Sequence, residues 1–276
     1  MKSGGPVYGL GIDSGSSFCK GALLVSGGEG RGLRIEALAS RPSGWDVAAT
    51  GARVLEALRK AAGAADLNGA RLPVAATGYG REQIPCCSDA LSEISAHAAG
   101  ADFLCPGVRT VVDIGGQDCK VIVVEGGKAR DFQMNDKCAA GSGRFLELVF
   151  SRLDADPAVM EALLTEGRSV SIDSTCAVFA ESELVGLLAQ GASRPEIMGG
   201  AVAALASRVA SLAARLSVSE PAVLSGGLAE SPGLARALSS ALGVTVRPLR
   251  RGTYSGAIGA ALRAAQSDGP PAAANE

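Results

Sequence analysis

The pattern Asp-x-Gly-x-x-x-Cys-Lys occurs twice in this chain, and the second copy lies 100 residues after the first. The two copies span residues 13–20 and 113–120. Each follows one apolar run and precedes another, so each predicts a strand, a tight glycine turn and a second strand. Two hairpins in the same register predict a duplicated α/β domain.

A glycine-rich hairpin of this kind can bind the phosphates of a nucleotide. Backbone N–H groups at such a bend point into one concavity and favour an anion, and the missing Cβ atoms permit its close approach. A nearby aspartate suits Mg²⁺. A further strand ends in Ser225-Gly226-Gly227 before a helix, which gives flat backbone for a purine and ribose. The three elements together predict a nucleotide site, although a single glycine-rich hairpin would not.

Composition limits the classes of partner. The net charge is −2 and aromatic residues make up 4% of the chain, which argues against binding to nucleic acid or to anionic membranes. We find no apolar stretch of the roughly 18 residues that a spanning helix needs. The first residues lead directly into an apolar strand, so we expect no signal peptide, no membrane association and a cytoplasmic location.

The cysteines and the histidine limit the chemistry. Seven cysteines in a cytoplasmic protein are not expected to form a disulfide framework, so some should be free thiols or metal ligands. His97 is the only histidine, which excludes a zinc site built on imidazoles.

The periodicity of the chain predicts two mixed sheets covered by helices. We expect a first domain over residues 1–108, a second over 109–265 and a disordered tail over 266–276. Strands are expected at 7–12, 20–26, 33–41, 72–76, 109–114, 121–125, 129–134, 223–224 and 244–246. Helices are expected at 47–62, 89–99, 139–153, 176–190, 195–216, 231–242 and 254–265.

Two cysteines, Cys138 and Cys176, directly precede predicted helices. The positive end of a helix dipole lowers the pKa of a thiol and stabilises negative charge, as an all-thiolate iron–sulfur cluster requires. Such a cluster takes four thiolates, so two per chain would suffice at a twofold axis between two copies. The alternative is that both residues are small buried apolar side chains, since the chain has no C-x-x-C.

Longer segments resemble one family. Residues 135–147, 174–183, 113–118, 77–81, 93–101 and 256–260 are similar to signature segments of the ATPase activators of 2-hydroxyacyl-CoA dehydratases. The related ATPase subunits of benzoyl-CoA reductase share them, and together these proteins form the BadF/BadG/BcrA/BcrD type. The resemblance covers nearly the whole chain.

The resemblance implies a duplicated actin/Hsp70/sugar-kinase-like (ribonuclease H-like) ATPase fold, with ATP in the cleft between two domains. It implies one [4Fe–4S] cluster per homodimer, held by the residues matching Cys138 and Cys176, together with ATP or ADP and Mg²⁺. A ferredoxin or flavodoxin would reduce the cluster. ATP hydrolysis would then drive a low-potential electron into a 2-hydroxyacyl-CoA dehydratase, or into the other subunits of a reductase, in an anaerobic setting.

Within this scheme we expect Asp13 and Asp118 to organise Mg²⁺ and water, and Gln117 to orient the attacking water. Asp13 could instead only cap a turn. The residues expected to bind the nucleotide are Ser14, Gly15, Ser16, Ser17, Phe18, Lys20, Asp113, Gly115, Gly116, Gly226 and Gly227. Lys20 and Lys120 could neutralise phosphate or could simply be solvated.

Other functions compete with electron transfer. A permanent subunit of a benzoyl-CoA reductase complex fits the same motifs. A sugar or acyl kinase of the same fold would transfer phosphate and hold no iron, and a nucleotide switch would bind ATP with negligible turnover. The remaining cysteines, Cys19, Cys86, Cys87, Cys105 and Cys119, are expected to be structural.

Overall fold

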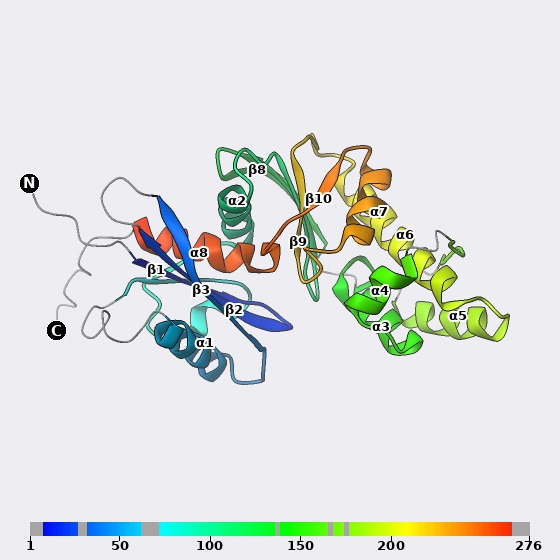
Figure 1. Cartoon of the computed structure of the whole chain (residues 1–276), viewed down its shortest axis with the longest axis horizontal. Coiled ribbons are helices and arrows are strands. Elements are labelled where there is room, and N and C mark those ends of the chain that lie inside the picture. Colours follow the sequence, from blue (N-terminus) through cyan, green and yellow to red (C-terminus); the bar gives the residue numbers. More distant parts are fainter. Residues whose placement is uncertain are drawn as a thin grey trace, which may run out of the picture. The chain divides into compact units, whose positions relative to one another are not determined.

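The computed structural model describes residues 8–26, 32–61, 72–135, 139–164, 168–173 and 177–266 (Figure 1). Contacts divide the chain into two compact units. Unit 1 is Met1–Gly100 together with Gly256–Glu276, and unit 2 is Ala101–Ser255. The chain therefore leaves unit 1 within helix α2 (Glu93–Leu104) and re-enters it at the start of helix α8 (Ser255–Gln266).

A five-stranded sheet with the order β3-β2-β1-β4-β5 forms the centre of unit 1. Its strands are β1 (Tyr8–Ser14), β2 (Phe18–Ser26), β3 (Leu33–Pro42), β4 (Val74–Thr77) and β5 (Asp89–Ala90). β1, β2 and β3 pair antiparallel, whereas β4 is parallel to β1 and β5 is parallel to β4. A short 3₁₀ helix, η1 (Arg81–Gln83), follows β4.

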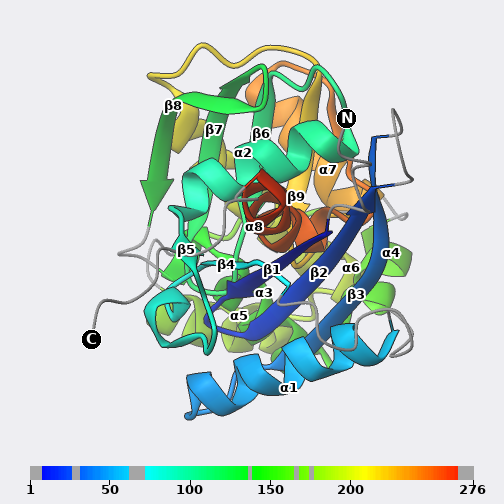
Figure 2. The same cartoon turned by 90° about the vertical axis from the view of Figure 1, so that its left-hand side faces the viewer.

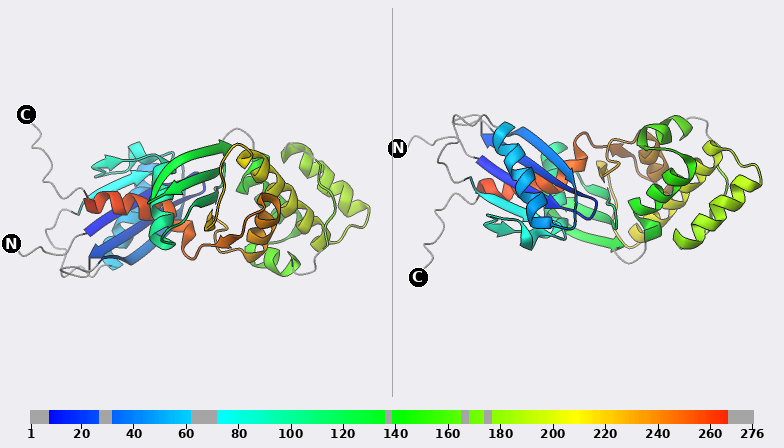
Figure 3. Two further views of the ribbon diagram at one scale, coloured as in Figure 1. Left: turned by 90° about the horizontal axis from the view of Figure 1, so that it is seen from above. Right: turned by 90° about the horizontal axis from the view of Figure 1, so that it is seen from below.

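Alternate residues of β1 face opposite sides of this sheet, and each side is covered by a helix. On one side Leu10 and Ile12 pack in a core with Val54 and Leu58 of helix α1 (Val47–Ala61). Helix α8 covers the other side of β1, and Figures 2 and 3 show the two helices on opposite sides of the strands. β1 is therefore buried on both faces of the sheet, which explains the apolar and small residues along this strand.

Two glycines bring α8 directly onto the backbone of β1. A Cβ atom at Gly9 would lie 2.1 Å from the carbonyl oxygen of Ala261, and one at Gly11 would lie 2.0 Å from that of Ala257. Neither distance is possible for a real side chain, so only glycine fits at these two positions. The close approach sets the position of the first turn of α8 relative to the end of β1.

Unit 2 repeats the sheet of unit 1. Its strands are β6 (Thr110–Ile114), β7 (Cys119–Glu125), β8 (Lys128–Asn135), β9 (Ala222–Gly226) and β10 (Val246–Pro248). They lie in the order β8-β7-β6-β9-β10, with three antiparallel strands and then two parallel ones, as in unit 1. The predicted duplication and the two mixed sheets are confirmed.

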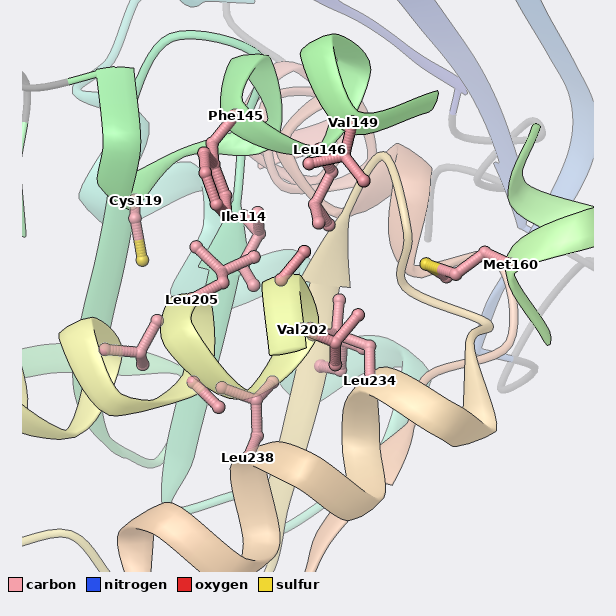
Figure 4. Packing of buried hydrophobic residues seen from close by; sticks show 14 of the residues in the cluster. Ile114, Cys119, Phe145, Leu146, Val149, Met160, Val202, Leu205, Leu234 and Leu238 are labelled. Carbon is pink, nitrogen blue, oxygen red and sulfur yellow. The ribbon is translucent and has the colours of Figure 1, made fainter. Parts of the chain in front are cut away.

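Helices cover the sheet of unit 2 and form its main core. They are α3 (Gly143–Leu153), α4 (Pro157–Leu164), α5 (Ala177–Ala189), α6 (Arg194–Ala213) and α7 (Pro232–Leu242), with the 3₁₀ helices η2 (Ala139–Gly141) and η3 (Gly252–Tyr254). Figure 4 shows Phe145 of α3, Leu205 of α6 and Leu234 of α7 packed in one region together with Ile114 of the sheet. All four belong to one buried cluster.

Helix α6 is the one helix among the described residues that is long and apolar enough to cross a membrane, whereas the sequence analysis found no apolar stretch of that length. Half of the most apolar 18-residue stretch of this helix is buried inside unit 2. Ile197, Val202 and Leu205 belong to the core cluster. These contacts make α6 a core helix of unit 2.

The observed elements depart from the predicted ones in several places. The helix predicted over 89–99 begins only at Glu93, because Asp89 and Ala90 form β5 beside β4. Helix α4 was not predicted, and β10 lies two residues later than expected. The contacts also place residues 101–108 in unit 2 and the described part of 256–266 in unit 1, whereas the predicted boundary lay at 108/109. The tail beyond residue 266 lies outside the described residues.

Candidate functional site

The first hairpin makes a narrow bend between β1 and β2. The N–H of Gly15 donates to the carbonyl oxygen of Phe18 at 3.2 Å, and the register pairs Asp13 with Lys20. Gly15, Ser16 and Ser17 are half-buried at the bend, whereas the side chain of Phe18 is exposed. The predicted nucleotide-binding residues of this copy therefore lie together at one end of the sheet of unit 1.

The end of β4 supports this bend. Gly78 has φ +92°, and a Cβ atom there would lie 2.5 Å from the carbonyl oxygen of Ser14. The N–H of Gly80 donates to the same oxygen at 3.2 Å. Since a side chain at Gly78 would both strain the backbone and strike the hairpin, glycine is required there.

The carboxylate of Asp13 lies in a buried position between two helices. A Cβ atom built on Gly256, in the first turn of α8, would be 2.8 Å from Oδ2 of Asp13 and 3.0 Å from Nε2 of His97 on α2. Asp13 and His97 are each 5% exposed. The carboxylate thus lies beside the N-terminal end of α8, the end of a helix that favours a nearby anion. Sequence reasoning did not place His97 at the site, because no local signal pairs it with Asp13.

The second hairpin has the same bend but a different set of charges. The N–H of Gly115 donates to the carbonyl oxygen of Asp118 at 3.0 Å. The ammonium of Lys120 donates to Oδ2 of Asp118 at 2.7 Å and lies 3.5 Å from Oδ2 of Asp113. The side chains of Lys120, Asp118 and Asp113 are 3%, 6% and 2% exposed respectively. Lys120, for which the sequence left a solvated position open, is therefore buried between two carboxylates.

The bend of the second hairpin is bonded to the start of α3. The N–H of Gly143 donates to the carbonyl oxygen of Gly115 at 2.8 Å, and that of Arg144 donates to Gly116 at 2.9 Å. The hydroxyl of Ser142, which is fully buried, also lies within hydrogen-bond distance of the Gly116 carbonyl, at 3.2 Å. The first N–H groups of α3, which have no partner within a helix, are thus used to hold the hairpin.

The end of β9 repeats the arrangement at the end of β4. Gly226 has φ +91°, and a Cβ atom there would lie 2.2 Å from the carbonyl oxygen of Ile114. The N–H of Gly227 donates to that oxygen at 3.2 Å. Gly226 and Gly227 therefore lie against the second hairpin, together with the buried Asp113 and Asp118, while Gln117 is exposed at the bend.

The duplication extends to the hydroxyl side chain that ends each of these strands. Thr77 donates through Oγ1 to the carbonyl oxygen of Leu91 at 3.0 Å, and Ser225 donates through Oγ to that of Gly252 at 3.1 Å. Each bond ties the end of a parallel strand to the segment that follows the next strand. Both hairpins are thus supported by the same kind of frame.

These residues suit a magnesium nucleotide. Each bend combines a hairpin, whose N–H groups can face a phosphate, with a buried carboxylate. Mg²⁺ is bound through one or two carboxylates, retained waters and phosphate oxygens, and Asp13 and Asp118 supply that kind of ligand. The first hairpin belongs to unit 1 and the second to unit 2.

The predicted cluster ligands Cys138 and Cys176 lie outside the described residues. The elements that follow them are described: η2 begins at Ala139 and α5 begins at Ala177, directly after each cysteine. Among the described residues no three His, Cys, Asp or Glu side chains are grouped as a metal site. The placement of the two cysteines before helical turns fits thiolate ligands, whose charge such turns favour.

Other cysteines do not fit a thiolate role. Burial, and then the charge of Asp13, raises the pKa of the Cys19 thiol to about 12. Burial, and then the charge of Asp113, raises the pKa of Cys119 strongly as well. Both thiols stay protonated at neutral pH, as expected for structural residues.

Comparisons with known proteins identify relatives of this chain. The (R)-2-hydroxyglutaryl-CoA dehydratase activating ATPase of Acidaminococcus fermentans is 42% identical over 264 residues, 94% of this chain and 97% of that protein. One of the subunits of benzoyl-CoA reductase from Thauera aromatica is 34% identical over 197 residues, 68% of this chain and 70% of that protein. Both relatives are thus of the classes that the sequence motifs indicated.

A solved structure is similar over nearly the whole chain. The activator of 2-hydroxyisocaproyl-CoA dehydratase from Clostridium difficile, with bound ADPNP, has a TM-score of 0.84 and 37% identity, and 94% of each chain is covered. The duplicated actin/Hsp70-like ATPase fold is thereby confirmed. Residues 10–264 match the family described as the BadF/BadG/BcrA/BcrD ATPase family. The chain belongs to the BadF/BadG/BcrA/BcrD ATPase family.

Proposed function

We propose that this chain is an ATP-dependent electron-transfer activator of a 2-hydroxyacyl-CoA dehydratase. It would act in the cytoplasm as a homodimer and take electrons from a ferredoxin or flavodoxin. The names of the relatives support the dehydratase as partner, since two of them are activators of such enzymes. The acyl group of the substrate is a property of the partner.

The two hairpins are proposed to bind the phosphates of ATP with Mg²⁺. Asp13 and Asp118 would hold the metal and its waters, and Gln117, exposed at its bend, would orient the attacking water. The expected nucleotide-binding residues are the bend residues of both hairpins, Lys20, Asp113, Gly226 and Gly227. The ADPNP bound to the similar activator from Clostridium difficile supports a nucleotide in this fold.

One [4Fe–4S] cluster per homodimer is proposed to be held by Cys138 and Cys176 of each chain. When bound, such a cluster supplies one-electron transfer at low potential. The helical turns that begin at Ala139 and Ala177 support this choice, because their N-terminal ends favour thiolates. The buried thiols of Cys19 and Cys119 are unsuited to the same task.

The observation that carries the proposal is the bonding of the second hairpin to α3. Gly143 and Arg144 donate to the carbonyl oxygens of Gly115 and Gly116, and Cys138 lies five residues before Gly143. A shift of the bend on nucleotide binding or hydrolysis would therefore be passed to the segment that carries Cys138. This short route would give ATP turnover a mechanical link to electron transfer.

Helices α3 and α5, which follow the two cysteines, are also joined to each other. Ala180 and Leu184 of α5 lie in the same buried cluster as Phe145 of α3. On the surface Arg152 of α3 forms an ion pair with Glu181 of α5. A movement of α3 would thus be shared by α5 and would reach both proposed ligands.

The test is the iron content of protein purified without oxygen. We expect about four irons and four sulfides per two chains, and their loss in Cys138→Ala and Cys176→Ala. Cys86→Ala, which changes an exposed cysteine, is the matched control. Iron bound equally by all four proteins would refute the cluster assignment, and normal ATP hydrolysis by Asp13→Ala would refute the role of the first hairpin.

A second candidate is an ATPase component of a benzoyl-CoA reductase complex, which the similarity to the reductase subunit from Thauera aromatica favours. An activator should stimulate a separately purified dehydratase in the presence of ATP and a reductant. A reductase component should transfer electrons only within a stable complex of several subunits. A kinase, the least favoured alternative, would transfer phosphate to an added substrate without iron.

A further inference from the structure

Lys120 is an unusual residue to find at the base of a proposed magnesium site. Its ammonium is almost completely buried and lies between the carboxylates of Asp118 and Asp113, at 2.7 and 3.5 Å. A buried charge is stable only when it is paired, and the shorter contact is a charge-assisted hydrogen bond. The three groups together carry a net charge of −1.

The two carboxylates around Lys120 are also what a divalent cation would seek. Their Oδ2 atoms both lie within 3.5 Å of the same nitrogen, so they converge on one point. Carboxylate oxygens are the preferred protein ligands of Mg²⁺ and Mn²⁺. The ammonium of Lys120 therefore occupies the place towards which a bare cation would be attracted.

We propose that Lys120 is a resident counter-ion that keeps a bare divalent cation out of the second hairpin. The metal then enters only together with a nucleotide, whose phosphates add negative charge to carboxylates that the lysine already neutralises in part. Lys120 is thus a positioning residue, which holds Asp118 and Asp113 in place between turnovers. The inference rests on the proposed metal–nucleotide site. It gives Lys120 a role other than the neutralisation of phosphate considered in the sequence analysis.

The first hairpin supplies an internal comparison. Lys20 pairs in register with Asp13, as Lys120 does with Asp113, but Phe18 stands where the second hairpin has Asp118. Lys20 is also only half-buried, whereas Lys120 is 3% exposed. Removal of Lys20 therefore leaves one carboxylate rather than two and should not create a cation site.

The experiment is a titration of the full chain with Mn²⁺ in the absence of nucleotide, in which electron paramagnetic resonance measures the free ion. Wild type, Lys120→Gln and Lys20→Gln are compared, and the melting temperature of each is measured with and without Mn²⁺. We expect Lys120→Gln to bind one additional Mn²⁺ at least about tenfold more tightly than wild type. We also expect Mn²⁺ to raise the melting temperature of this variant more than that of wild type or Lys20→Gln.

Several results would overturn the proposal. One is that Lys120→Gln binds Mn²⁺ with the same affinity as wild type. Another is that Lys20→Gln gains as much affinity for Mn²⁺ as Lys120→Gln does. If Lys120→Gln does not fold, the binding of Mn²⁺ to wild type without nucleotide still tests the proposal. Tight binding that is lost in Asp118→Asn would contradict the exclusion of the cation by Lys120. Weak binding that is unchanged in Asp118→Asn would support it. Binding of a fluorescent ATP analogue with Mg²⁺ is measured separately, so that a failure of the proposed nucleotide site is distinguished from a failure of this inference.

Discussion

Replacement of Gly11 by alanine is expected to disrupt the contact between β1 and α8. The new Cβ atom would lie 2.0 Å from the carbonyl oxygen of Ala257 and 2.2 Å from the N–H nitrogen of Ala261. Both obstacles are backbone atoms of a regular helix, which cannot rotate aside as a side chain can. The strand and the helix must therefore separate.

The size of the effect follows from this overlap. Ordinary contact with a Cβ atom begins at 3.4 Å, so the nearest atom must retreat by more than 1 Å. Adding one methyl group to a well-packed core costs about 1–3 kcal/mol, and more when the surroundings cannot adjust. Because the obstacle is backbone, we expect a loss of about 3 kcal/mol in the free energy of unfolding of unit 1.

Urea unfolding followed by circular dichroism measures the loss, and hydrogen exchange of the α8 amides locates it. Gly44→Ala is the matched control, since a Cβ atom there would meet its nearest neighbour at 3.7 Å. We expect the control to unfold as wild type does. If Gly11→Ala were within about 0.5 kcal/mol of the control, the close packing of α8 on β1 would be refuted.

Three further predictions concern single side chains. Asp118→Asn should lower ATP hydrolysis at least about 100-fold while ATP still binds, and unchanged phosphate release would exclude a catalytic role. The pKa of Cys19 rises from 9.0 to about 12, so between these values the unfolded chain loses a proton that the folded chain keeps. Stability therefore falls as the pH rises through this window, by at most about 1.4 kcal/mol per pH unit from this group, and Cys19→Ala should make urea midpoints less pH-dependent there. Ser231→Ala removes the side chain that accepts from the Leu234 N–H at the start of α7, and a thermal melt should show a loss of about 1 kcal/mol.

The hairpins could be predicted because their signal is local. A glycine turn between two apolar runs fixes the strand pairing, and the register that places Asp13 opposite Lys20 and Asp113 opposite Lys120 follows from the turn. The glycines at the end of β9 were recognised for the same reason. Periodicity could not predict short elements such as β5. Its two residues form a strand only because β4 lies beside them.

The rest of the candidate site depends on contacts between residues far apart in the chain. The burial of Lys120 depends on how the sheet of unit 2 is covered, and local sequence does not report that. The position of His97 beside Asp13 depends on the crossing of α2 and α8, where a Cβ at Gly259 would lie 1.9 Å from the carbonyl oxygen of Ala96. The sequence contains the small residues Gly259 and Ala96, but no local pattern indicates that they contact each other.

The docking of α8 on β1 also sets the order in which the chain can fold during synthesis. Unit 2 is continuous from Ala101 to Ser255 and is complete before α8 has been translated, whereas unit 1 lacks the helix that covers Gly9 and Gly11. At bacterial and eukaryotic elongation rates this face of β1 stays uncovered on the ribosome for roughly 10 to 50 s. The part of the protein that is made first is therefore finished last, and protease sensitivity of stalled nascent chains should persist in unit 1 until α8 has emerged.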